Sequence, residues 1–185
     1  MRRAAFLDRD GVINRKAREG EYVTRWEDME ILPGVPEAIT LLNQAGFRVI
    51  VVSNQRCVAK GLITIADLEA LHRRMRKTLA SDGATIDAIY YCPHEKHPPC
   101  RCRKPQPGML LDAARDHNID LASSWMIGDS DVDVEAGRKA GCMTAVIAGR
   151  RTNAQGGVSV IAPSLLEAIQ KIVQVKKAAT GRSRH

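Results

Sequence analysis

The chain has 185 residues, of which 44% are hydrophobic and 26% charged, with a net charge of +7 and five cysteines. This length suits one domain with an aliphatic core, and no apolar run is long enough to span a bilayer. The cysteines are odd in number and clustered, and the basic N-terminus lacks the long apolar stretch of a signal peptide. Both features argue against a secreted disulfide framework, so we expect a cytoplasmic protein.

Apolar runs and helical patterns alternate along the chain. Strands are expected at residues 4–8, 47–54, 88–92, 124–129 and 143–149, where short apolar segments rich in β-branched residues occur. Helices are expected at 33–45 before Gly46, at 65–81 after the capping residue Thr64, at 107–117, at 132–140 and from Pro163 onward. This order predicts an α/β fold, a Rossmann-like parallel sheet flanked by helices on both faces.

Part of the basic charge is local. The segment 72–77, "HRRMRK", is expected to be the solvent face of a helix, and residues 176–185 a flexible basic tail after a single domain at 1–175. Neither segment interleaves aromatic and basic residues as a base-stacking surface does, so the sequence does not support nucleic-acid binding. The general basic charge is equally compatible with an anionic small substrate or with solubility alone.

Polar residues follow three of the expected strands. Asp8 and Asp10 follow the first, Ser53 and Asn54 the second, and Asp129 the fourth. Ligands of open α/β sheets bind beyond the carboxyl ends of the strands, so these side chains are expected to meet there. Two carboxylates one residue apart repel unless a hard cation or a reaction uses them; taken alone, they could also form a solvated turn.

Two further motifs carry charge. Lys104 follows Arg103 and precedes a proline, and an ammonium held there could balance a phosphoryl group, although a solvated basic pair is the simpler interpretation. Asp129, Asp131 and Asp133 form either a cation site or a strongly capped helix start.

A second cluster has the spacing C-x-H-x5-C-x-C. It comprises Cys92, His94, Cys100 and Cys102, a ligand set that suits tetrahedral Zn²⁺ in a closed structural site. An iron–sulfur cluster suits this set less well, and a coincidence of reduced cysteines is the remaining alternative. His97 is expected to be a spare residue, and Cys57 and Cys142 small buried ones. A zinc loop at 92–102 would fix Arg103 and Lys104, which follow it directly.

The ordered motifs over residues 4–150 resemble the haloacid dehalogenase-like (HAD-like) phosphotransferase superfamily. The stretches "DRDGVIN", "SNQ", "CPH", "CRCRKPQPGM" and "GDSDVD" narrow the resemblance to heptose bisphosphate phosphatases and the related histidinol-phosphate phosphatase domains. One departure is Arg56-Cys57, because the family usually has Ser-Gly after "SNQ"; the substrate detail at that loop is therefore open.

The resemblance implies a mechanism. Asp8 is expected to be the nucleophile and Asp10 the general acid and base, with Ser53 and Lys104 binding the transferring phosphoryl group. Mg²⁺ is expected at Asp8, Asp129 and the backbone carbonyl of Asp10, with Asp133 in support. No large cap domain is expected, so the pocket should be open. The expected substrate contacts are Arg18, Glu19, Gly20, Glu21, Tyr22, Asn54, Gln55, Arg56, Arg103 and Ser130.

The resemblance implies removal of the C7 phosphate from D-glycero-D-manno-heptose 1,7-bisphosphate, for bacterial lipopolysaccharide sugars. Histidinol-phosphate hydrolysis is the nearest alternative, a polynucleotide 3′-phosphatase another, and an inactive zinc-stabilised binding module a rival of a different class. We expect a monomer whose partner is a small phosphorylated sugar, with no membrane contact and no nucleic acid.

Overall fold

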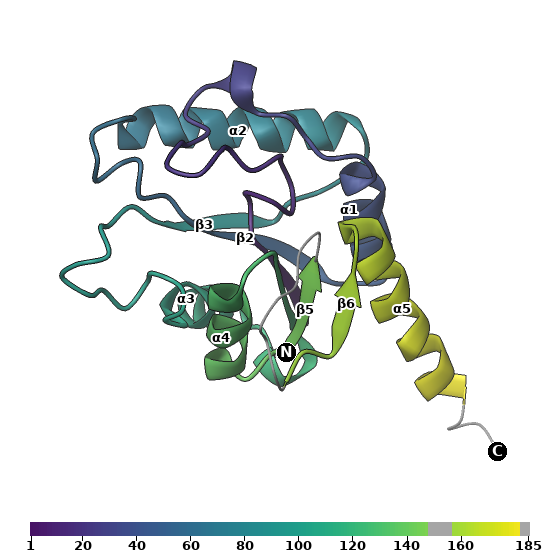
Figure 1. The fold of residues 1–185 in the computed structure, drawn as a ribbon. Helices are drawn as coiled ribbons and strands as arrows, with labels where there is room; N and C mark the ends of the chain where they lie inside the picture. Colours follow the sequence, from purple (N-terminus) through teal and green to yellow (C-terminus); the bar gives the residue numbers. More distant parts are fainter. Residues whose placement is uncertain (148–156, 182–185) are drawn as a thin grey trace.

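The computed structural model describes residues 1–147 and 157–181, with side chains up to residue 174. Within them, six strands form one parallel sheet of order β3-β2-β1-β4-β5-β6 (Figure 1). The strands are β1 (Ala4–Leu7), β2 (Arg48–Asn54), β3 (Ala88–Cys92), β4 (Trp125–Gly128), β5 (Met143–Ile147) and β6 (Val160–Ala162). The predicted parallel α/β architecture is confirmed, and β6 is an addition that the sequence pattern did not indicate.

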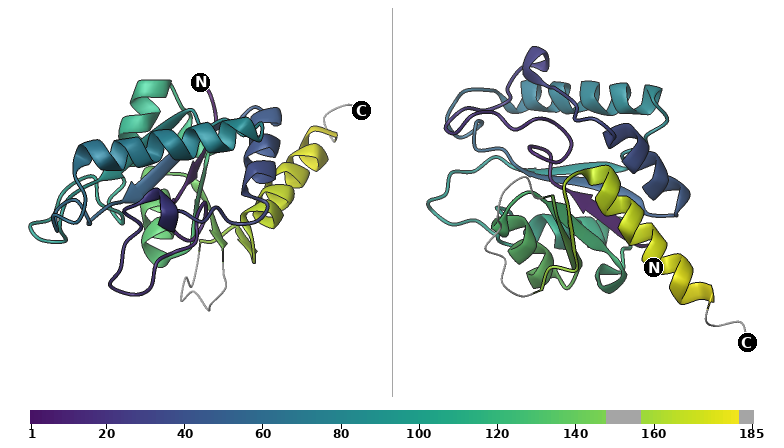
Figure 2. Two further views of the ribbon diagram at one scale, coloured as in Figure 1. Left: turned by 90° about the horizontal axis from the view of Figure 1, so that it is seen from above. Right: turned by 45° about the vertical axis from the view of Figure 1, so that its right-hand side comes forward.

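Helices cover both faces of the sheet (Figures 1 and 2). One face carries α1 (Val35–Gln44), α2 (Ile65–Ser81) and α5 (Leu165–Gly181), and the other carries α3 (Gly108–His117) and α4 (Asp131–Ala140). Two short 3-10 helices, η1 (Trp26–Asp28) and η2 (Leu121–Ser123), lie in the connections. None of the helices in the described part of the chain is long and apolar enough to cross a membrane.

The position of strand β1 in the middle of the sheet explains why its sequence is continuously apolar. Ala5 and Leu7 belong to the core beneath α1, α2 and α5, whereas Ala4 and Phe6 belong to the core beneath α3 and α4. All four residues are 0% exposed. A parallel strand covered on both faces buries both sets of alternating side chains, so no polar residue interrupts it.

Local signals set the helix ends. Thr64 Oγ1 accepts a hydrogen bond from the backbone N–H of Asp67 at 3.1 Å, as the capping pattern predicted. Gly46, with φ of 76°, follows the end of α1 in the left-handed conformation that glycine adopts without strain.

The structure bears on two expectations about basic segments. His72 and Met75 are buried, at 4% and 0% exposure, so only part of segment 72–77 is a solvent face. Helix α5 continues through Gly181, so residues 176–181 of the expected flexible tail are helical, while 182–185 lie outside the described residues. The end of the expected fifth strand, 148–149, also lies outside them.

The sheet register brings distant polar residues together. Leu7 is paired with Val51 of β2 and with Ile127 of β4. Asp8 follows Leu7 directly, and Ser53 and Asp129 each stand two residues beyond its partners. All three therefore lie at the carboxyl edge of the sheet, as the sequence predicted.

Candidate active site and metal centres

Lys104 is a buried cation held between two acids. Its Nζ lies 2.8 Å from Asp8 Oδ1 and 2.6 Å from Asp133 Oδ1, and it donates to the carbonyl of Val52 at 2.8 Å. The residue is 3% exposed, and burial alone would lower the pKa of its ammonium. The carboxylates of Asp133 and Asp8 outweigh burial and raise the pKa, so Lys104 remains charged.

Asp8 has the opposite balance of effects. Burial raises the pKa of its carboxyl. The Lys104 charge lowers this pKa and the Asp133 charge raises it, and the net result is a pKa raised to about 7. An additional positive charge beside Asp8 would stabilise the ionised form of its carboxyl.

The acids at this edge fit a divalent cation. Oxygen atoms of Asp8, Asp129 and Asp133 lie within 4.8 Å of one another. Asp129 Oδ1 is buried and has no hydrogen-bond partner among the described residues, while Oδ2 of the same carboxylate accepts from Lys16 Nζ at 2.7 Å. An unsatisfied carboxylate oxygen beside other acids is the environment that Mg²⁺ prefers.

Two glycines let the backbone approach these acids closely. Gly11 has φ of 93°, and a Cβ there would lie 2.3 Å from Asp129 Oδ2. A Cβ on Gly128 would lie 2.2 Å from Cβ of Asp133. Both distances are impossible for a side chain, so the acids can converge only because these two positions are glycine.

Asp10 is held by four hydrogen bonds from nitrogen donors. Its Oδ1 accepts from Arg9 Nη2 at 3.0 Å, Arg9 Nε at 3.3 Å and Asn14 Nδ2 at 3.0 Å, and its Oδ2 accepts from Gln55 Nε2 at 3.0 Å. Burial would raise the pKa of this carboxyl, but the Arg9 charge and the hydrogen bonds together lower it. Asp10 is therefore fixed in orientation and favoured as the carboxylate.

Strand β2 connects Lys104 to the remaining predicted residues. Ser53 is 1% exposed, and its Oγ accepts from Gln55 Nε2 at 2.6 Å. The side chain of Asn54 donates to the carbonyl of Lys104 and accepts from its N–H, both at 3.0 Å. These two bonds attach the backbone of Lys104 to the end of the strand.

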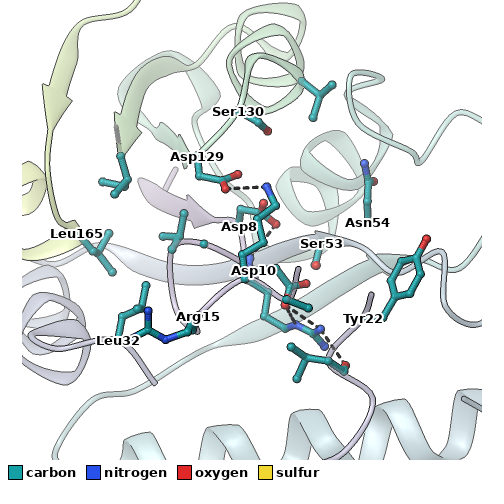
Figure 3. Close-up of a pocket in the computed structure, with 18 of the residues that line it drawn as sticks. Asp8, Asp10, Arg15, Tyr22, Leu32, Ser53, Asn54, Asp129, Ser130 and Leu165 are labelled. Atoms are coloured by element: carbon teal, nitrogen blue, oxygen red, sulfur yellow. Dashed lines mark hydrogen bonds and ion pairs between the residues drawn. The ribbon is translucent and has the colours of Figure 1, made fainter. Parts of the chain in front are cut away.

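The acids open into a cleft of about 1280 Å³ (Figure 3). In Figure 3, Asp8, Asp10, Ser53 and Asp129 lie close together in this cleft. Eight of the ten expected substrate contacts line it, namely Arg18, Glu19, Gly20, Glu21, Tyr22, Asn54, Arg103 and Ser130.

The other two expected contacts lie elsewhere. Gln55 is 1% exposed and stands behind Asp10 and Ser53, so it supports them instead of facing the cleft. Arg56 forms an ion pair with Glu95 of the Cys/His loop.

Ser130 lines the cleft, but its hydroxyl donates to Asp133 Oδ2. Asp133 in turn pairs with Lys104, which is the supporting role that we expected for it.

Sequence reasoning missed other walls of the cleft. Arg15 and Lys16 line it, and they stand four and five residues after Gly11, the end of the Asp-x-Asp-Gly motif. Two adjacent cations so close to an acid pair were a usable signal. Leu32 and the segment 163–165 also line it. Those residues reach the site only because α5 packs beside α1, for which no short motif exists.

The Cys/His cluster has the geometry of a four-ligand site. The Sγ atom of Cys92 lies 3.5 Å from that of Cys100 and 3.1 Å from that of Cys102, and His94 Nδ1 lies 3.2 Å from Cys102 Sγ. Tetrahedral zinc with bonds of about 2.3 Å would separate its sulfur ligands by about 3.7 Å, so the four donors fit zinc with small adjustments.

The remaining thiols behave as expected. Cys57 is 0% exposed and Cys142 8% exposed, and neither belongs to the cluster. His97 is also outside it, in agreement with its expected role as a spare residue.

Comparison with known proteins adds a family context. A family model for HAD-hydrolase-like proteins matches residues 101–168. The chain is 42% identical over 156 residues to D-glycero-beta-D-manno-heptose-1,7-bisphosphate 7-phosphatase of Bordetella bronchiseptica, covering 83% of this chain and 86% of that protein. It is 44% identical over 131 residues to the D-glycero-alpha-D-manno-heptose-1,7-bisphosphate 7-phosphatase of Mycobacterium bovis, covering 70% and 68%.

A solved structure agrees with these relatives. The crystal structure of D,D-heptose 1,7-bisphosphate phosphatase from B. bronchiseptica, complexed with magnesium and phosphate, superposes with a TM-score of 0.85 at 38% identity. The match covers 93% of this chain and 98% of that one. The similarity therefore extends over nearly the whole chain.

Proposed function

The chain belongs to the D-glycero-D-manno-heptose-1,7-bisphosphate 7-phosphatase family of HAD-like hydrolases, and we propose that it hydrolyses heptose 1,7-bisphosphate at C7. The products are the heptose 1-phosphate and inorganic phosphate. The observation that carries this proposal is the convergence of Asp8, Asp10, Ser53, Lys104 and Asp129 on one cleft, in a chain similar throughout to a phosphatase crystallised with magnesium and phosphate.

The first half-reaction is phosphoryl transfer to the protein. A carboxylate oxygen of Asp8 attacks phosphorus, the bond between phosphorus and the sugar oxygen breaks, and an aspartyl-phosphate forms. Asp10 donates a proton to the departing sugar oxygen. Lys104, fixed beside Asp8, balances negative charge on the phosphoryl group, and the hydroxyl of Ser53 donates a hydrogen bond to one of the phosphoryl oxygens.

The second half-reaction restores Asp8. Asp10 takes a proton from water, and the water oxygen attacks phosphorus and breaks its bond to Asp8. The proton taken here is the one that Asp10 donates in the next cycle, so the two halves balance as ester plus water giving alcohol plus phosphate. The Arg9 charge and the hydrogen bonds that lower the pKa of Asp10 make its protonated form a ready donor, and they keep it ionised after the first half-reaction, when it must accept a proton.

Two metals have residues to hold them. The carboxylates of Asp8 and Asp129 and the backbone carbonyl of Asp10 would hold Mg²⁺, which when bound neutralises charge on the phosphoryl oxygens. Cys92, His94, Cys100 and Cys102 would hold a structural zinc ion, which ties down the loop leading into Arg103 and Lys104. We place the reaction in the cytoplasm, where thiols stay reduced.

A substrate panel tests the proposal. Phosphate release is measured with Mg²⁺ for both anomers of heptose 1,7-bisphosphate, histidinol phosphate and a 3′-phosphorylated oligonucleotide. We expect the highest kcat/KM with one heptose anomer, and no release by the Asp8→Asn variant, whose melting temperature should stay within a few degrees of the wild type. Faster hydrolysis of histidinol phosphate or the oligonucleotide would replace the substrate assignment, and an active Asp8→Asn enzyme would remove the nucleophile assignment.

A further inference from the structure

Arg9 is a charged residue in an unusual place. It is 1% exposed and is the largest of the fully buried side chains in the described part of the chain. A buried guanidinium is stable only when its N–H groups have partners. Arg9 has three: Asp10, the carbonyl of Val23 at 3.3 Å from Nη2, and Nε2 of His72 at 3.2 Å from Nη1.

The contact with His72 defines the state of the imidazole. Arginine has donors and no acceptor, so Nε2 of His72 accepts the hydrogen bond from Arg9 Nη1 and the ring proton is on Nδ1. His72 is 4% exposed, and burial together with the neighbouring Arg9 charge lowers its pKa to about 3. His72 is thus a neutral acceptor, directed at the end of the guanidinium that faces away from Asp10.

We propose that Arg9 and His72 are positioning residues, which act through Asp10 and set the orientation of its carboxyl toward the leaving oxygen. His72 and the Val23 carbonyl fix the plane of the guanidinium, so that its Nε and Nη2 edge is presented to Asp10 Oδ1. Gln55 fixes the other carboxylate oxygen from the opposite side. This inference rests on the proposed function, since it assumes that Asp10 is the proton donor.

Helix α2 takes part in the chemistry through His72. None of the residues of α2, all of which the structure describes, lines the cleft. Through His72, however, this helix controls the angle of a carboxyl that does line it. Proton donation requires the donor and the leaving oxygen to be aligned. A change at His72 should therefore lower kcat/KM more for esters whose leaving group needs a proton than for esters whose leaving group does not.

Two substrates separate this role from a purely structural one. A sugar alkoxide is a strong base and leaves only with a proton, whereas p-nitrophenolate is a weak base and leaves without one. The ratio kcat/KM reports the steps from free enzyme up to departure of the alcohol, so it isolates the half-reaction in which Asp10 is the acid. A loosened fold would lower kcat/KM for both esters together.

The experiment compares His72→Phe, His72→Gln and Met75→Leu. His72→Phe keeps a ring but removes the acceptor, so kcat/KM for the heptose bisphosphate should fall about tenfold or more, while that for p-nitrophenyl phosphate stays within about threefold. His72→Gln places an acceptor oxygen at a similar reach and should restore most of the activity toward the sugar ester. Met75→Leu, a buried substitution one turn away on α2, should leave both values unchanged.

Equal changes for the two esters, or no change in either, would overturn the inference. If His72→Phe does not fold, Arg9→Lys is the second variant. A lysine keeps the charge but cannot reach Asp10 and His72 together, so kcat/KM should again fall more for the heptose bisphosphate than for p-nitrophenyl phosphate. An equal fall for the two esters would contradict the inference. Failure of the proposed function looks different. A wild type inactive on heptose bisphosphate but active on another alkyl phosphate would refute the substrate alone, and the same comparison with that ester would still decide on Arg9 and His72.

Discussion

Single buried charges hold the site together. Lys104 is enclosed by Asp8, Asp133 and the Val52 carbonyl, and Arg9 by Asp10, His72 and the Val23 carbonyl. Removing Lys104 or Arg9 would leave its partner carboxylates without a compensating charge in a dry environment, and breaking a buried ion pair in this way typically destabilises a protein by about 3–5 kcal/mol. In Asp8→Asn, by contrast, Lys104 keeps the Asp133 carboxylate as its partner. The same residues therefore support both the chemistry and the stability of the fold.

His72 makes folding sensitive to acid. Its pKa is about 3 in the folded chain and near the ordinary value of 6.5 when unfolded. Between these values only the unfolded chain binds the proton, so the free energy of unfolding should fall as pH falls, by about 2 kcal/mol between pH 7 and pH 5. Denaturant titrations of wild type and His72→Gln should diverge by this amount over that range; parallel curves would show that His72 titrates normally in the folded state.

At the scale of elements, the start of α3 and the Cys/His loop form one unit. The N–H of Gly108 donates to the carbonyl of Arg101 at 3.1 Å, and a Cβ on Gly108 would lie 2.2 Å from that oxygen. The helix thus packs directly against the backbone between two cluster cysteines. Arg56 and Glu95 attach the other side of the loop to the segment after β2.

Gly108→Ala should disturb this unit. The added methyl group must push the Arg101–Cys102 backbone away, so we expect a loss of about 1–3 kcal/mol in the free energy of unfolding and a lower kcat through displacement of Lys104. Leu111→Ala, at a position 44% exposed on the same helix, is the control and should change stability by no more than about 0.5 kcal/mol. Normal stability and activity of Gly108→Ala would mean that the loop moves freely relative to α3.

Removal of the proposed zinc should act on the same unit. Chelation, followed by return to excess Mg²⁺, should lower the melting temperature and phosphatase activity together, because the loop that ends at Lys104 loses its anchor. Cys100→Ala should mimic chelation, whereas Cys142→Ala, a buried thiol outside the cluster, should retain bound zinc by metal analysis. Unchanged melting after verified zinc loss would make the cluster irrelevant to the fold.

Across the whole molecule, the sequence predicted what local patterns encode. The apolar run of β1, the Thr64 cap and the acids placed directly after strands are local features, and each lies where the pattern indicated. The motif order in the chain was enough to predict that these acids share one edge of the sheet, because parallel strands place their carboxyl ends together.

Features that depend on long-range packing could not be predicted. The inward direction of Arg9 depends on an acceptor supplied by His72, 63 residues further on, and the Lys16–Asp129 pair joins residues 113 apart. Strand β6 has three residues and forms only where β5 offers a partner. Arg56 carries the same charge whether it faces a substrate or Glu95, and only the folded loop decides which.

The parallel sheet also places the cleft and a turn suited to chemical attachment at opposite edges. Every site residue lies at the carboxyl end of a strand or in the loop beyond it, whereas the exposed turn at 81–83 precedes β3 at the opposite edge. A cysteine introduced by Asp82→Cys would give a handle for a fluorophore or a sensor chip, with the reactive cleft facing away from the support. An immobilised enzyme tethered there should turn over at the solution rate, and one tethered through Glu19 on the cleft wall should not.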